Sequence, residues 1–101
     1  MRTLYTALLR VAPPLGGRVA LAAVVAETDG PAPALAALAA IDDPGIDRFQ
    51  PAWATRAHLL WQLGALGEAA DAYREAIRLS PDESVRAHLT ARLQQCESGL
   101  T

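Results

Sequence analysis

The apolar residues between positions 50 and 80 recur at spacings of three and four, which is the period of an amphipathic α-helix. Two consecutive segments each place three of them on one helical face. These residues are Trp53, Ala57 and Leu60 in the first segment and Ala69, Tyr73 and Ala76 in the second. β-Branched residues are sparse outside positions 19–25, and no stretch alternates apolar with polar residues as a half-buried strand does. The pattern predicts an all-α fold.

Glycine and proline residues indicate where the helices begin and end. Gly64 and Gly67 bracket a short turn between the two segments, because helices often end at a glycine. The pairs at 30–31 (Gly-Pro) and 50–51 (Gln-Pro) each indicate a helix start with proline in the first turn. The stretch 42–45, Asp-Asp-Pro-Gly, indicates a turn.

The stretch 80–83, Ser-Pro-Asp-Glu, has the pattern of a capping box and predicts the start of a last helix over residues 82–96. That helix would place four residues on one face, namely Val85, Leu89, Leu93 and Cys96. Its other side is polar, which is typical of a helix that caps the end of a helical stack.

Residues 53–81 carry the signature of a tetratricopeptide repeat, a helix-turn-helix unit of 34 residues. Its positions require a Trp, small residues where the helices approach, bulky residues beside them and a closing Pro. They are filled by Trp53, Ala57, Leu60, Ala69, Tyr73, Ala76 and Pro81. We therefore predict a tetratricopeptide-like helical-hairpin repeat, an α-solenoid fragment of about six antiparallel helices.

The same period extends towards the N-terminus. Tyr5 and Tyr73 lie two periods apart, within the similar stretches YTALLRVAP and YREAIRLSP, and Gly30 and Gly64 lie one period apart. We predict one domain over residues 1–101. It divides into the second helix of a truncated repeat (2–12), a degenerate repeat (16–49), a good repeat (50–83) and the capping helix (82–96).

In the degenerate repeat, an offset of 34 residues assigns the core positions to smaller side chains. Val19, Ala23, Leu35 and Ala39 take the places of Trp53, Ala57, Ala69 and Tyr73. This assignment predicts a thinner core in the first half of the domain.

About half of the 101 residues are apolar, enough for one modest core. The net charge of −2 and the absence of a basic stripe predict no direct contact with nucleic acid. No apolar segment reaches the roughly 20 residues that span a bilayer, so no membrane contact is expected. The apolar run 19–26 follows three arginines and could pass for a signal peptide, but its fit to the repeat favours a helix. The lone Cys96 suits a reducing compartment, and we expect a cytoplasmic protein.

No combination of side chains predicts an enzyme, a cofactor or a metal site. His88 lies eight residues from Cys96, about 12 Å along a helix, which is not the spacing of zinc ligands. No nucleophile motif accompanies either His58 or His88. The charged residues of the second segment form i,i+3 pairs on a solvated face, Asp71 with Arg74 and Glu75 with Arg78.

The expected function is therefore binding through a surface. In stacked helix pairs the first helices line a concave groove with positions that the core does not use. These positions are Ala54, His58, Trp61 and Gln62 in the good repeat and Ala20, Val24, Glu27 and Thr28 in the degenerate one. Trp61 has two interpretations, packing against a neighbouring helix or contact with a partner. The groove is mostly apolar and lacks the clustered Lys and Asn residues that clamp an acidic peptide tail.

The N-terminal end offers a second candidate surface. Because the first helix of the truncated repeat is missing, Leu4, Leu8 and Val11 would border an uncovered apolar face. We expect either an upstream part of a longer polypeptide or a second copy, in a homodimer, to cover that face.

The chain as a whole resembles the C-terminal extension of one group of bacterial extracytoplasmic-function RNA polymerase sigma factors. In that group a tetratricopeptide-like domain follows the two promoter-binding sigma regions. The resemblance runs from Leu4 to about Leu93 and rests on LYTALLRVAP, AETDGPAPALAALAAI, FQPAWATRAHLLWQLGALGEAADAYREAI and VRAHLTARL. One departure is that Ala20 and Leu21 stand where such domains usually carry an Asn-Arg pair.

The resemblance implies a regulatory, protein-binding role in transcription initiation. Its partners would be the sigma regions of the same polypeptide or RNA polymerase, contacted through the face around Leu4, Leu8 and Val11. The alternative is a free-standing tetratricopeptide adaptor, which would bind a peptide or protein in the groove through Trp61 and His58.

Overall fold

The computed structural model describes residues 15–100, which form five α-helices and one 3₁₀ helix, with no strand among them. In chain order they are α2 (Leu15–Asp29), α3 (Pro31–Ala39), η1 (Ile46–Arg48), α4 (Gln50–Gln62), α5 (Leu66–Leu79) and α6 (Glu83–Leu100). The prediction of an all-α fold is confirmed for these residues. The helix predicted over residues 2–12 lies outside the described part of the chain, so the expected total of about six remains a prediction.

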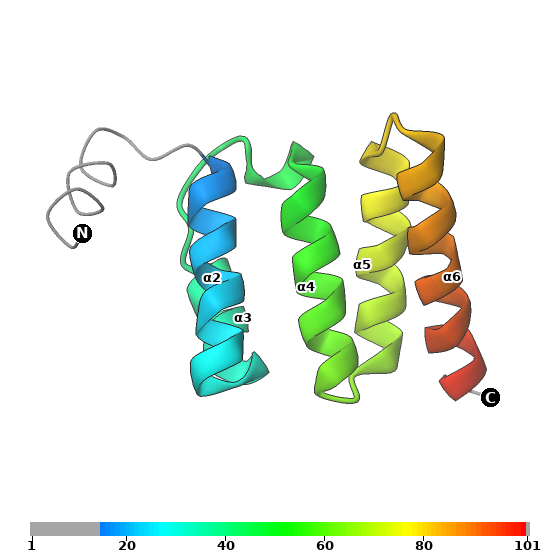
Figure 1. Ribbon diagram of the computed structural model, residues 1–101, viewed down its shortest axis with the longest axis horizontal. Helices are drawn as coiled ribbons and strands as arrows, with labels where there is room; N and C mark the ends of the chain where they lie inside the picture. The colour runs from blue at the N-terminus through cyan, green and yellow to red at the C-terminus, as the bar shows by residue number, and fades with distance from the viewer. Residues whose placement is uncertain (1–14, 101) are drawn as a thin grey trace, which may run out of the picture.

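Consecutive helices are antiparallel and pack side by side (Figure 1). α2 packs against α3, α4 against α5, and α5 against α6, while α2 and α4 also touch directly. In the view of Figure 1, α2, α4 and α6 lie towards the reader, with α3 behind α2. The helices α2, α4 and α6 therefore present one common face of the molecule.

Alanine makes up much of the core because the helices approach one another closely. Ala57, Ala69 and Ala76 are fully buried, and the Tyr73 ring, 2% exposed, fills the space beside them. They belong to a larger cluster that joins α4, α5 and α6 and includes Leu89 and Cys96 on α6. A smaller cluster joins α2, α3 and α4, and its buried members are Val19, Ala22, Leu38 and Ala52.

The core positions of α3 differ from those that a 34-residue offset predicts. Ala34 and Leu38 are buried, whereas Leu35 is half-buried and Ala39 is exposed. On α2, likewise, Ala22 is buried and Ala23 only partly so. Val19 is buried as the 34-residue offset predicts, and Leu35 packs partly buried against the larger core cluster. The predicted core positions Ala23 and Ala39 were wrong, because the residues one position earlier, Ala22 and Leu38, are the buried ones.

The physical reason is that the two glycines used to set the offset occupy different places in their turns. α2 joins α3 through Gly30 alone, whereas three residues, 63–65, join α4 to α5. The helices α3 and α5 begin 35 residues apart, at Pro31 and Leu66. An offset of 35 pairs Ala34 with Ala69 and Leu38 with Tyr73, and all four are buried.

The turn between α4 and α5 confirms the predicted role of Gly64. Its φ of 79° lies in the left-handed region that favours glycine. The Gly64 N–H donates to the Trp61 carbonyl at 3.0 Å, and the Ala65 N–H donates to the Leu60 carbonyl at 3.0 Å. This pair of hydrogen bonds is the Schellman pattern, and it satisfies carbonyls at the end of α4.

The start of α6 differs from the predicted capping box. α6 begins at Glu83, and the Asp82 carboxylate, not the Ser80 hydroxyl, accepts a hydrogen bond from the Ser84 N–H at 2.8 Å. The Ser80 hydroxyl instead donates to the Ala76 carbonyl at 2.8 Å and closes the end of α5. Ser80 is the last residue before a proline, in an extended conformation (φ −87°, ψ 120°), and so ends one helix and leaves Asp82 to start the next.

α6 is also longer than predicted, and one residue of its predicted apolar face is not covered. Leu89 and Cys96 are buried and Leu93 is partly buried, whereas Val85 is 38% exposed.

The predicted ion pairs Asp71 with Arg74 and Glu75 with Arg78 are present. Arg74 also reaches Glu97 at 3.1 Å, which links α5 to α6. None of the described helices combines the length and the apolar character needed to cross a membrane.

Candidate binding site

An open pocket of about 470 Å³ lies between α2 and α4 on the face that these helices share with α6. We call it the α2–α4 pocket. It is lined by Ala23, Ala26, Glu27, Ala54, Thr55, His58, Leu59 and Gln62. Three of these eight residues are alanines, and their short side chains leave the space open. Leu59, 2% exposed, closes the inner side.

The pocket brings together about half of the groove residues that the sequence predicts. Glu27 from α2 and Ala54, His58 and Gln62 from α4 all line it. The other α2 residues of the prediction, Ala20, Val24 and Thr28, are exposed but do not line it. The one-residue shift in register explains the difference. With an offset of 35, the α2 counterparts of His58, Trp61 and Gln62 are Ala23, Ala26 and Glu27, and all three counterparts line the pocket.

Trp61 lies beside the α2–α4 pocket without lining it. Its side chain is 37% exposed and stacks on His58, with ring centroids 5.9 Å apart and the planes inclined by 25°. On its other side the guanidinium carbon of Arg92 from α6 lies 5.8 Å from the Trp61 ring centroid. Trp61 belongs to neither core cluster. Trp61 therefore lies outside the core, with about a third of its surface open to solvent and the rest covered in part by His58 and Arg92.

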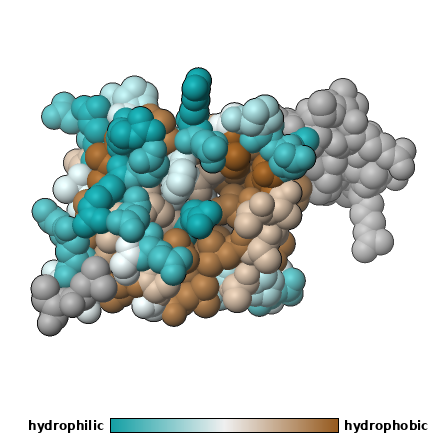
Figure 2. Space-filling model, turned by 180° about the vertical axis from the view of Figure 1, so that it is seen from behind, coloured by the Kyte–Doolittle hydropathy of each residue, from teal (hydrophilic) through white to brown (hydrophobic). Residues whose placement is uncertain are grey.

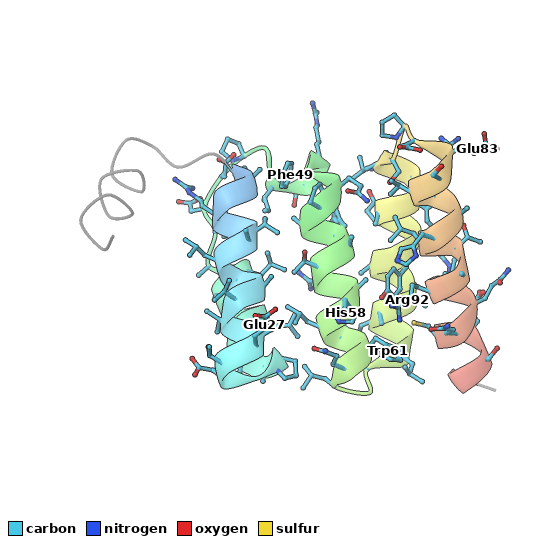
Figure 3. All side chains as sticks on the ribbon, viewed as in Figure 1. Glu27, Phe49, His58, Trp61, Glu83 and Arg92 are labelled. Carbon is cyan, nitrogen blue, oxygen red and sulfur yellow. The ribbon has the colours of Figure 1, made fainter. Side chains whose placement is uncertain are left out.

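Four side chains on three helices thus form a line, which we call the cross-helix row: Glu27, His58, Trp61 and Arg92. Figure 3 shows them side by side across the lower half of α2, α4 and α6. Sequence reasoning did not find Arg92. Its place beside Trp61 depends on how α6 packs in the stack, and no local motif encodes that packing.

The row has opposite charges at its two ends. Glu27 is the only charged residue that lines the α2–α4 pocket, and it makes no ion pair with any other described residue. Arg92 contacts Trp61 and likewise makes no ion pair within the described part of the chain. The acidic residues Asp71, Glu75 and Glu97, by contrast, pair with arginines of α5. The charges of the row are available to a partner.

A second surface surrounds Trp53. The Trp53 indole N–H donates to the Asp47 carbonyl at 2.9 Å, and Arg56 lies 5.9 Å from the ring centroid. Hollows of about 190 and 380 Å³ flank these two side chains. The acidic residues of the larger hollow include Asp71 and Glu75, and a hydrogen bond from Arg78 lowers the pKa of the Glu75 carboxyl. Asp71 and Glu75 are held in ion pairs, whereas Glu68, which also lines this hollow, makes no ion pair with a described residue. The second surface is the weaker candidate because Trp53 is partly buried against the larger core cluster and its indole N–H is already hydrogen-bonded.

The outer surface of α2 and α3 is apolar. The run 19–26 contains only apolar residues, but Val19 and Ala22 alone are buried in α2, and Val24 is 53% exposed. Three alanines of α3, at positions 32, 36 and 39, are exposed, and so is the alanine that follows the helix, Ala40. Figure 2 shows apolar side chains gathered on the half of the molecule that holds α3, and hydrophilic ones on the half that holds α6. The predicted face at Leu4, Leu8 and Val11 lies outside the described residues.

Comparisons of the chain with protein-family models, curated proteins and solved structures gave no significant match. A function for this surface is therefore proposed from its own residues and from the sequence resemblance to sigma-factor extensions.

Proposed function

We propose that this chain is a tetratricopeptide-like protein-interaction domain whose partner binds across α2, α4 and α6. The observation that supports this most directly is the exposure of Trp61 beside the open α2–α4 pocket. Tryptophan is usually largely buried, and it is enriched among the residues that dominate binding energy in protein interfaces. An indole that is 37% exposed and bordered by a hollow has the character of such an anchor.

The packing of α4 and α5 supports the tetratricopeptide-like part of the proposal. The small residues of the signature, Ala57, Ala69 and Ala76, are fully buried where the helices approach, and Tyr73 fills the space beside them. First helices that line one face, as α2, α4 and α6 do, are what such stacks use to form a concave binding surface.

We further propose that the domain acts in the bacterial cytoplasm as the regulatory C-terminal part of an extracytoplasmic-function sigma factor. The sequence resemblance from Leu4 to Leu93 supports this role. The apolar, largely uncovered outer side of α2 is consistent with it, because α2 is the first described helix of the chain and so stands nearest in sequence to the sigma regions that the resemblance implies. The partner would be the sigma regions of the same polypeptide or RNA polymerase.

A free-standing adaptor is the second candidate, and one observation favours it. The α2–α4 pocket and the cross-helix row are formed entirely by described residues of this chain, so they need no upstream domain to be complete. An adaptor would use that surface to hold a peptide segment of another protein.

The size and association state of the native polypeptide separate the two candidates. A lysate of the source cells is separated on a glycerol gradient, and the fractions are immunoblotted with an antibody raised against this chain and with one against the RNA polymerase β subunit. The sigma role predicts a polypeptide several times larger than the 10.7 kDa chain, present in the polymerase fractions.

The purified 10.7 kDa chain, run on a parallel gradient, gives the reference size and position. If the native polypeptide has this size and is absent from the polymerase fractions, the sigma role is wrong and the adaptor role is favoured.

A further inference from the structure

We propose that the α2–α4 pocket binds a basic side chain, Arg or Lys, presented by an extended segment of the partner protein. This inference rests on the proposed function, because it names the kind of segment that the binding face selects. The residues that support it are those of the α2–α4 pocket and of the cross-helix row.

The shape of the α2–α4 pocket suits a long side chain with an apolar stem. Its volume of about 470 Å³ is larger than any single side chain needs, and it is open to solvent on one side. Ala23, Ala26 and Leu59 offer an apolar surface at its walls. Arg and Lys bury their methylene stems along such surfaces while the charged head stays at a polar rim. An aromatic or aliphatic side chain would also fit this shape, so charge must decide between them.

The charge of the pocket favours a cation. Glu27 is the only charged lining residue, and no described side chain neutralises it. The other polar lining residues are Thr55, His58 and Gln62, and the Thr55 hydroxyl and the Gln62 amide oxygen can accept hydrogen bonds from a guanidinium or an ammonium group. A guanidinium can also bind the two carboxylate oxygens of Glu27 together. An acidic ligand would face Glu27 with no cation in the pocket wall to offset it.

The rest of the cross-helix row determines which kind of residue of the segment meets each helix. The next anchor after Glu27 and His58 is the exposed Trp61 ring, which suits an apolar or aromatic residue of the segment (Figure 3). Beyond it lies Arg92, whose guanidinium has no acidic partner among the described residues and suits a carboxylate. We therefore expect a segment that places a basic residue at α2, an apolar residue at α4 and an acidic residue at α6.

Glu27 is expected to determine which side chain the pocket prefers more than how tightly the segment binds. It is solvent-exposed, and an exposed ion pair changes binding only a few-fold, whereas complementary charges fix register and exclude wrong partners. The decisive readout is therefore which residue the site selects, with affinity as a second measure.

The test uses a phage-displayed random peptide library selected against the immobilised full chain, in parallel with Glu27→Gln, Glu27→Lys and Glu83→Gln. Glu83 is the matched control, since it is also an exposed glutamate but lies at the start of α6, away from the α2–α4 pocket (Figure 3). The consensus peptide is synthesised with a fluorescent label, and its binding to each protein is measured by fluorescence anisotropy.

We expect peptides with an Arg or Lys at a fixed spacing from an apolar residue. Glu27→Gln should lose the basic preference and bind the consensus peptide about 3- to 5-fold more weakly. Glu27→Lys should select an acidic residue at that position, and Glu83→Gln should behave as the unchanged chain does.

Three results would overturn the inference, and they separate its failure from failure of the proposed function. A consensus without a basic residue, or the same basic consensus from Glu27→Gln, would disprove the role of Glu27 and leave the protein-binding function standing. Failure of the unchanged chain to select any consensus would count against both the basic ligand and the binding face itself.

Discussion

Single alanine residues do two different things in this molecule, and burial distinguishes them. Ala57, Ala69 and Ala76 are fully buried and let helices approach one another. Ala23 and Ala26, in contrast, line the α2–α4 pocket, where the lack of a longer side chain leaves space for a ligand. A sequence rich in alanine shows that helices pack closely, but it does not show which alanines border a hollow.

Tyr73 and Cys96 are expected to make the protein sensitive to alkaline pH. Burial raises the pKa of the Tyr73 phenol above its ordinary value of 10.0, and burial likewise raises the pKa of the Cys96 thiol above 9.0. The folded chain therefore holds both protons more tightly than the unfolded chain does. The stability from these groups is fully present below the unfolded pKa values and is lost as pH rises through them towards the folded values. The chain contains no lysine, and arginine does not deprotonate, so few other groups titrate in this range.

Tyr73→Phe keeps the buried ring and removes the ionisable phenol. We expect the free energy of unfolding, measured by urea denaturation from pH 8 to pH 11, to fall less steeply above pH 9 in this variant than in the unchanged chain. An equally steep fall would mean that Tyr73 is not a source of the alkaline sensitivity. Cys96→Ala, tested alongside, separates the contribution of the thiol.

At the scale of elements, the sequence predicts helix starts better than it predicts which helix face is buried. The proline-marked starts of α3 and α4 and the Gly64 turn are confirmed because each depends on a local backbone preference. The buried face of α3 was assigned wrongly because it was carried over from α5 through the spacing of Gly30 and Gly64. Gly30 alone forms its turn, whereas Gly64 is the middle residue of a three-residue turn, so equal spacing of the two glycines does not give equal spacing of the helices.

The buried face of α3 can be tested with two matched substitutions. Ala34 is fully buried and Ala39 is exposed, so the same added side chain meets different surroundings at the two positions. Ala34→Leu should lower the free energy of unfolding by about 1–3 kcal/mol through overpacking. Ala39→Leu should change it by about 0.5 kcal/mol or less. Both are measured by urea denaturation, and a larger loss for Ala39→Leu would support the 34-residue offset instead.

At the scale of the whole molecule, the candidate site arises from how three helices are placed together. Glu27, His58 and Trp61 were chosen from the sequence, because positions outside the core stripe of a helix face a groove or solvent. Arg92 could not be chosen in this way, since it meets Trp61 only through the packing of α6. The free charge of Glu27 has the same origin. The helices around Glu27 place no described arginine within ion-pair distance of it, whereas Asp71, Glu75 and Glu97 each meet an arginine of α5.

Of the two tryptophans of α4, Trp53 is expected to contribute to stability and Trp61 to partner binding. Trp53 packs against the larger core cluster and donates its indole N–H to the Asp47 carbonyl, so Trp53→Ala should cost about 2–4 kcal/mol of unfolding free energy. Trp61 is more exposed and lies outside both core clusters, so Trp61→Ala should cost about 1 kcal/mol or less. Its loss should instead weaken binding of the library-selected peptide at least about tenfold, the scale of an interface anchor.

Urea denaturation and fluorescence anisotropy on the same two variants measure the two effects. If Trp61→Ala lowers the unfolding free energy by several kcal/mol, Trp61 is a packing residue, and the cross-helix row loses the anchor that gives a bound segment its direction. If Trp61→Ala leaves both stability and peptide binding unchanged, the peptide is held elsewhere. The hollows beside Trp53 and Arg56 then become the surface to test.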